Sequence, residues 1–192
     1  GITEYLSQKT KKKNNEAMLI YNKLLSVCPI TTHIPLKYVS KQISSNKILK
    51  KIIEINKFYK NYLNKTPKFA VTGLNPHCES NFKNSEEDKI IKPAIKQAQK
   101  KKLKVSGPFP ADTLFTKNNI KKFDVVIGMY HDQVIAPLKT IYNFNAINIT
   151  LGLPFIRISP DHGTNNQMLG KKKSDPTSLK EALLFLKKIN EN

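Results

Sequence analysis

The sequence predicts an α/β protein in which helices cover both faces of a largely parallel sheet. Apolar, strand-like runs alternate along the chain with stretches of helical periodicity, the pattern of a three-layer α/β/α domain. Residues 123–130 (FDVVIGMY) are almost continuously apolar, as in a central parallel strand buried on both faces. The length of 192 residues suits one domain, or one domain with part of a second.

Further strands are expected wherever a short apolar run stands between polar segments. They are two runs within 16–30, and single runs at 68–76, 146–150 and 154–158. In open α/β sheets, binding sites lie at the carboxyl ends of the strands. We therefore expect functional side chains among the residues that follow these runs.

Three internal helices are predicted between these strands. Residues 44–63 are amphipathic, with large apolar side chains at helical spacing. Residues 86–102 form a second helix, which Pro93 either kinks or begins. Residues 131–141 form a third, which is expected to be interrupted near Pro137.

The last helix is predicted from a capping-box pattern, in which Ser178 is followed three residues later by Glu181. Its apolar face is expected to consist of the following residues at helical spacing: Leu179, Leu183, Leu186 and Ile189.

The chain is strongly basic, with 33 Lys and Arg against 14 Asp and Glu and a net charge of +19. Such a charge is typical of nucleic-acid-binding domains. All the basic residues except Arg157 are lysines spread over most predicted helices, which favours a solvated lysine surface that attracts anions. We therefore expect no nucleic-acid partner.

The two cysteines, Cys28 and Cys78, form no secreted disulfide framework, and a reduced cytoplasmic protein is expected. No apolar run is long enough to span a membrane and no signal peptide is recognised, so no membrane partner is expected. The chain begins at Gly1 without an initiator methionine, as in a processed chain or a piece of a longer one.

Three histidines lie at or near positions where functional side chains are expected. The spacing of His33, His77 and His131 matches no zinc finger or HExxH helix, and separate surface or core histidines are the alternative. However, His131 ends the most apolar strand and His77 follows a turn after another strand. We predict that the three converge on one divalent metal ion.

Arg157 is the only arginine in a chain that otherwise uses lysine. Its planar, two-pronged guanidinium suits a phosphate or a carboxylate, and the alternatives are chance retention or a buried ion pair. It lies in the segment 150–164, where Gly152 and Gly163 permit close approach of a ligand. The sequence contains no Rossmann or P-loop glycine motif.

Several motifs together resemble the 4-hydroxythreonine-4-phosphate dehydrogenase (PdxA) family. They are GLNPHCES, GPFPADTLF (107–115), MYHDQ with Lys139 following, NITLGLPFIR (148–157) and DHGT. The resemblance covers the carboxyl-terminal portion of a family member. It implies a fold of the isocitrate/isopropylmalate dehydrogenase-like type without the amino-terminal part of the second domain. Residues 1–165 would then form a metal- and substrate-binding domain, and 166–192 a helix packing on the missing part.

The resemblance also implies roles for individual residues. The metal ligands would be His33, His77 and His131, holding Zn, Co or Mg. Substrate would contact Thr3, Lys139, Asn148 and Arg157, while Lys139 and Asp132 would take part in catalysis. The NAD adenosine would contact His162, Gly163, Thr164 and Asn165.

The implied activity is the NAD-dependent, metal-assisted oxidation and decarboxylation of 4-phosphooxy-L-threonine to 3-amino-2-oxopropyl phosphate in vitamin B6 (pyridoxine) biosynthesis. The resemblance also implies a cytoplasmic homodimer whose active site is shared between subunits. Two alternatives stay open, because Ile2 stands where the family has histidine. The chain could act on another four-carbon acid phosphate, such as threonate or erythronate 4-phosphate, or be a catalytically silent fragment.

Overall fold

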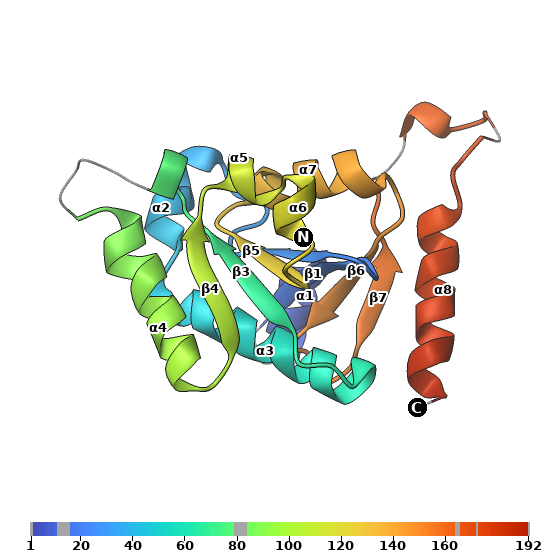
Figure 1. Ribbon diagram of the computed structural model, residues 1–192. Helices are drawn as coiled ribbons and strands as arrows, with labels where there is room; N and C mark the ends of the chain where they lie inside the picture. The colour runs from blue at the N-terminus through green and yellow to red at the C-terminus, as the bar shows by residue number, and fades with distance from the viewer. Residues whose placement is uncertain (1, 11–15, 79–83, 164–165, 172, 192) are drawn as a thin grey trace.

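The computed structural model describes residues 2–10, 16–78, 84–163, 166–171 and 173–191. Its centre is one seven-stranded sheet in the order β4-β3-β5-β2-β1-β6-β7 (Figure 1). The strands are β1 Ala17–Tyr21, β2 Ser26–Pro29, β3 Lys68–Thr72, β4 Lys104–Phe109, β5 Val125–Gly128, β6 Ile147–Leu151 and β7 Arg157–Pro160. Strands β4, β3, β5 and β2 are parallel, whereas β1 runs antiparallel to both β2 and β6, and β7 antiparallel to β6. The predicted central strand is β5, and all four of its residues are buried.

Helices cover both faces of the sheet, which confirms the three-layer α/β/α fold class. The helices are α1 Ile2–Lys9, α2 Val39–Gln42, α3 Ser45–Leu63, α4 Lys92–Lys100, α5 Ala111–Leu114, α6 Lys117–Ile120, α7 His131–Tyr142 and α8 Thr177–Asn190. Side chains of α3, α4 and α8 join the core on one face, and side chains of α5, α6 and α7 join the core on the other. No helix in the described ranges is long and apolar enough to cross a membrane.

The alternation of side chains along β1 shows why one strand serves both cores. Ala17, Leu19 and Tyr21 pack on the α3 side, whereas Met18 and Ile20 pack on the α7 side. The same alternation fixes the faces of the other strands, including β6 and β7, which carry predicted site residues.

Helix α3 confirms the prediction for 44–63. The hydroxyl of Ser44 accepts a hydrogen bond from the Lys47 amide at its start, and Asn64 ends it in a left-handed conformation. Ile48, Ile52 and Ile55 are fully buried on the sheet. Each such side chain stabilises the fold by about 1.5–3 kcal/mol relative to an exposed one.

The two prolines expected to disturb helices behave differently. A π-helical turn, η3 (Glu87–Ile91), precedes α4, so Pro93 lies in the first turn, where its missing N–H is tolerated. The predicted interruption at Pro137 is wrong, because α7 continues through it. Its buried residues Val134 and Leu138 pack on the sheet on either side of the proline and hold the helix together.

The last helix was placed correctly, but its predicted cap and apolar face are wrong. Ser178 lies inside α8 and is 1% exposed; it hydrogen-bonds to the sheet side rather than capping the helix. Ala182 and Phe185 share its face and pack on the core. The leucines at 179, 183 and 186 are therefore exposed, by 48%, 59% and 36%. Ile189, by contrast, packs partly on the core.

The predicted strand at 154–158 begins later, at Arg157, because residues 152–155 form a bend. Helix α8 packs against β7 and β6 at the end of the sheet (Figure 1). The proposed division of the chain at residue 165 remains a prediction.

Candidate active site

The three predicted metal-binding histidines follow three neighbouring parallel strands. His33 follows β2, His131 begins α7 directly after β5, and His77 lies in the turn η2 (Pro76–Cys78) after β3. Because β5 lies between β3 and β2, their loops meet at one carboxyl edge of the sheet. The structure thus gathers the three loops, as the sequence predicted for side chains at strand ends.

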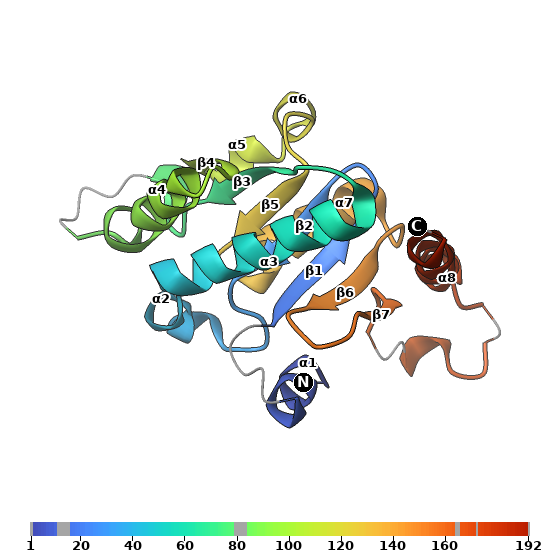
Figure 2. The same cartoon turned by 90° about the horizontal axis from the view of Figure 1, so that it is seen from below.

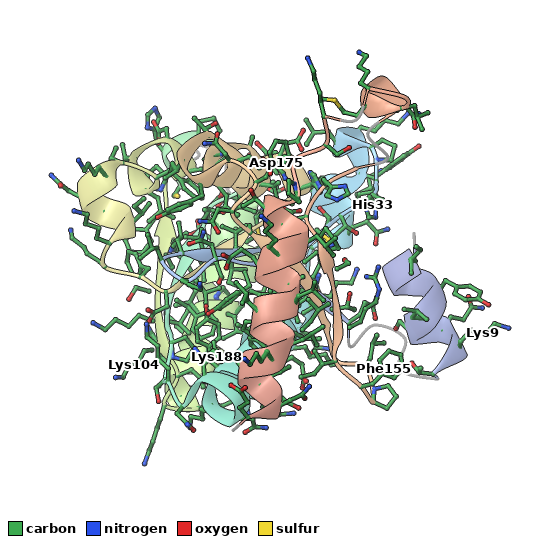
Figure 3. All side chains as sticks on the ribbon, turned by 90° about the vertical axis from the view of Figure 1, so that its right-hand side faces the viewer. Lys9, His33, Lys104, Phe155, Asp175 and Lys188 are labelled. Atoms are coloured by element: carbon green, nitrogen blue, oxygen red, sulfur yellow. The ribbon has the colours of Figure 1, made fainter. Side chains whose placement is uncertain are left out.

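His33 (labelled in Figure 3) and His131 lie close together, with ring centroids 6.2 Å apart. The two rings thus lie next to each other, and imidazole nitrogens are common ligands of zinc, which they bind at about 2.0–2.1 Å. The Nδ1 of His131 lies 2.6 Å from Oδ1 of Asp132. A carboxylate on Nδ1 orients the ring and leaves Nε2 for coordination.

His77 is not part of that cluster. Among the described residues, no group of three His, Cys, Asp or Glu side chains is close enough to hold a metal ion. The pair His33 and His131 lines a hollow of about 350 Å³ with Tyr130 and Asp132. Two imidazoles are an incomplete ligand set for zinc, which takes four ligands in structural sites and three protein ligands in catalytic ones.

The loop that carries His77 is held by Glu87, a residue that the sequence analysis did not single out. Its carboxylate accepts hydrogen bonds from the amides of Leu74 and Asn75 and from the Asn75 side chain. Burial by itself raises the pKa of the Glu87 carboxyl, but these hydrogen bonds outweigh it and lower the pKa below its ordinary value. The loop turns sharply beyond this anchor, with φ of 58° at His77.

Gln133 connects the loops of His77 and His131. Its Oε1 accepts hydrogen bonds from the Met129 amide at 2.7 Å and from the Thr72 hydroxyl at 2.8 Å. Its Nε2 donates to the Gly73 carbonyl at 2.7 Å. One side chain thus fixes the end of β5 relative to the end of β3, and it accounts for the glutamine in the MYHDQ motif.

The predicted substrate residues Asn148 and Arg157 share one face of the sheet. Ile147 and Ile149 point into the α3 core, so Asn148 and Thr150 point to the opposite face. Arg157 pairs with Thr150 across β6 and β7, and its Nη1 donates to the Thr150 hydroxyl at 3.1 Å. Within the described part of the chain, the buried Oδ1 of Asn148 has no hydrogen-bond partner. A cation and an unpaired acceptor therefore lie together.

Lys139 extends from α7, which covers that same face. Its ammonium donates to the carboxylate of Asp161 at 2.9 Å and to the Asp161 carbonyl at 2.8 Å. Asp161 is 9% exposed and begins the DHGT motif. The remaining substrate residue, Thr3, belongs to α1, which stands apart from the sheet in Figure 2. The Thr3 side chain lies outside the described residues.

The predicted cofactor residues His162 and Gly163 line a pocket of about 680 Å³. Thr164 and Asn165 lie outside the described residues. The other walls combine apolar Phe144, Met168 and Leu169 with the carboxylate of Asp175, which Figure 3 shows at the start of α8. An apolar surface for a base and a carboxylate for ribose hydroxyls fit the adenosine part of NAD.

The sequence did not predict Phe144 and Asp175 as residues of this pocket. The only local signal was the Asp175-Pro176 pair before the last helix, which is typical of a turn.

Comparison with known proteins gives consistent similarities. The family model described as "Pyridoxal phosphate biosynthetic protein PdxA" matches residues 1–186. A 4-hydroxythreonine-4-phosphate dehydrogenase from Sulfurihydrogenibium sp. (strain YO3AOP1) is 43% identical over 196 residues, covering 100% of this chain and 60% of that protein. A protein of Oceanobacillus iheyensis, provisionally named D-threonate 4-phosphate dehydrogenase, is 42% identical, covering 95% of this chain and 55% of its own.

Comparison with solved structures points to the same family. The crystal structure of 4-hydroxythreonine-4-phosphate dehydrogenase from Klebsiella pneumoniae matches with a TM-score of 0.82 and 34% identity. The match covers 97% of this chain and 57% of that one. The chain thus spans little more than half the length of the relatives that it matches.

Proposed function

Because the chain belongs to the PdxA family, we propose that it forms the metal- and substrate-binding part of a 4-hydroxythreonine-4-phosphate dehydrogenase. The reaction is the oxidation of 4-phosphooxy-L-threonine and its decarboxylation to 3-amino-2-oxopropyl phosphate, a step toward pyridoxal phosphate. The observation that carries the proposal is the shared face of β6, β7 and α7. Arg157 and Asn148 lie on that face of β6 and β7, and α7, which begins at His131 and carries Lys139, covers it.

Each residue has a role that its chemistry supports. Arg157 binds an anionic group of the substrate with two parallel N–H donors. The unpaired Oδ1 of Asn148 accepts a hydrogen bond from the amino or hydroxyl group. Lys139 binds a second anionic group or moves a proton, and Asp132 orients His131.

Two groups would be supplied from outside the chain. A divalent ion held by His33 and His131, with His77 as the third ligand, supplies Lewis-acid polarisation of a substrate oxygen. NAD, held against His162, Gly163 and Asp175, supplies the hydride acceptor. We further propose that Thr3, Thr164 and Asn165 contribute as the family resemblance implies.

The metal site is proposed to be completed in a homodimer. This is supported by His77 lying outside the His33–His131 cluster and by exposed apolar residues beside His33: Ile34, Leu36 and Tyr38 are 36%, 66% and 45% exposed. Sedimentation with and without zinc tests this. A monomer at every zinc concentration contradicts a shared site.

Zinc titration by calorimetry tests the ligands. Each of the variants His33→Ala, His77→Ala and His131→Ala should bind zinc more weakly than the parent chain. His162→Ala is the matched control outside the metal cluster and should bind zinc as the parent chain does. Unchanged affinity in all three variants contradicts the metal site.

Activity is tested by NADH formation from 4-phosphooxy-L-threonine with added Zn, Co or Mg, using mass spectrometry to detect 3-amino-2-oxopropyl phosphate. Arg157→Lys should raise KM strongly, because a lysine cannot form the paired hydrogen bonds. Absence of NADH formation by the dimeric, metal-loaded chain contradicts activity of this chain and favours a silent fragment.

A second candidate keeps the chemistry and changes the substrate. Ile2, 64% exposed, cannot hydrogen-bond a substrate as a histidine would. The relative named for D-threonate 4-phosphate is 42% identical, against 43% for the one named for 4-hydroxythreonine-4-phosphate. Threonate or erythronate 4-phosphate would place a hydroxyl where 4-phosphooxy-L-threonine has its amino group. Comparing kcat/KM for the three compounds decides between them.

A further inference from the structure

Asp161 stands between two parts of the proposed active site. Its side chain holds the ammonium of Lys139, which the proposed function assigns to the substrate. Its neighbours His162 and Gly163 line the 680 Å³ pocket proposed for NAD. One buried residue therefore contacts the substrate side and adjoins the cofactor side.

The backbone of Asp161 is fixed independently of its side chain. Its amide donates to the Ser178 hydroxyl at 2.7 Å, and that hydroxyl donates to the Ala146 carbonyl at 2.5 Å. Ser178 is 1% exposed and also lines the pocket. Ala146 directly precedes β6, the strand that carries Asn148. The hydrogen bonds thus form a continuous path from the pocket to the start of β6.

A second contact connects Lys139 to the pocket. Its ammonium lies 5.1 Å from the centre of the Phe144 ring, and Phe144 forms part of the pocket wall. An ammonium over an aromatic face is attracted by the ring quadrupole. A ligand that moves Phe144 or Ser178 would therefore change the surroundings of Lys139.

From these contacts we infer that Asp161 is a positioning residue that aims Lys139 at the substrate and links that lysine to occupancy of the NAD pocket. The inference deepens the proposed function and rests on it for the identity of the pocket ligand. Asp161 uses two of the three ammonium N–H groups, so the third is the donor that Lys139 would offer to the substrate.

The test is the acetylation rate of each lysine in the full chain, measured by peptide mass spectrometry after brief treatment with acetic anhydride. Acylation needs an amine with a free lone pair, so an ammonium bonded to two oxygens reacts slowly. Asp161→Asn should increase the rate at Lys139 several-fold. The matched control is Asp124→Asn, which breaks a similar ion pair with Lys65 and should accelerate only Lys65.

The link to the pocket is tested by repeating the measurement with saturating NAD. NAD should change the rate at Lys139 in the parent chain but not in Asp161→Asn. Ser178→Ala removes the backbone anchor of Asp161, so NAD that calorimetry shows to be bound should no longer change the rate at Lys139 in this variant. This variant also serves if Asp161→Asn fails to fold, which the melting temperature reports.

The outcomes distinguish a failure of the positioning role or of the link to the pocket from a failure of the proposed function. An unchanged rate at Lys139 in folded Asp161→Asn overturns the positioning role. If calorimetry shows NAD binding but Lys139 does not respond, the link is overturned and the proposed function stands. If NAD does not bind, the cofactor assignment fails and the link fails with it, while the comparison without NAD still decides the positioning role.

Discussion

The hydrogen bond between Arg157 and Thr150 leads to a quantitative prediction about anion binding. Thr150 is fully buried, and its hydroxyl accepts from Arg157 Nη1 at 3.1 Å. Thr150→Val keeps the shape of the side chain and removes this acceptor. A hydrogen bond to a charged group contributes about 1.5–3 kcal/mol, and Arg157 is only partly buried, so the lower end applies. About 1.4 kcal/mol corresponds to a tenfold change in affinity.

We therefore expect Thr150→Val to bind inorganic phosphate about tenfold more weakly than the parent chain. Because Arg157 is the only arginine, the chain has a single arginine Nε–Hε signal in a proton–nitrogen correlation spectrum, and phosphate can be titrated against it without assignment. Thr150→Ser keeps a hydroxyl and should restore the affinity. Thr140→Val removes a hydroxyl that is bonded only to its own helix and should have no effect. Equal phosphate affinity in the parent chain and Thr150→Val would refute the reasoning.

Three further predictions concern Glu87, Gly107 and Gln133, which lie on elements next to the histidine loops. Glu87→Gln should lower the free energy of unfolding by about 1–3 kcal/mol at neutral pH, since the carboxylate holds the loop of His77. The folded pKa of Glu87 is lowered, so its stabilising effect is fully present above the ordinary value of 4.5 and is lost as the pH falls through the folded value. Urea titrations of both proteins should therefore converge in acid; a constant difference would contradict this. Gly107→Ala should destabilise by roughly 1–3 kcal/mol in the same titrations, because Gly107 has φ of 131° and an added Cβ would lie 2.4 Å from the Val71 carbonyl oxygen. Wild-type stability would show that this backbone relaxes. Gln133→Glu removes the donor to Gly73 and should perturb the His77 imidazole signals in NMR spectra, whereas Gln99→Glu, with a similar bond to a backbone carbonyl, should not.

Much of the fold could be predicted because it depends on local periodicity. The apolar run at 123–130 became the buried strand β5, and the isoleucines of 44–63 became the buried face of α3. The placement of His33 and His131 at neighbouring strand ends followed from the same pattern. These features depend on which face of a strand or helix is apolar, and the order of apolar and polar residues in the sequence shows that face directly.

The errors and omissions depend on contacts between distant residues. Ser178 has the spacing of a helix cap, but a hydrogen bond to Ala146, 32 residues away, places it inside the helix. Phe185 lies on the same face of α8 as the buried Ser178, so Phe185 rather than the leucines enters the core. Gln133 was missed for a similar reason, since its partner Thr72 lies 61 residues earlier. No local pattern encodes such pairings.

The position of β1 sets the distance between two groups of predicted site residues. It separates β2, which leads to His33, from β6, which carries Asn148. Two strand spacings of about 4.8 Å put these strands roughly 10 Å apart. The first hairpin of the chain therefore acts as a spacer between the imidazoles and the side chains proposed to bind anions. A molecule that contacts both groups must bridge that width, and only long side chains such as Arg157 and Lys139 shorten the span. The width of one antiparallel strand thus separates the two groups of side chains that the proposed ligand would bridge.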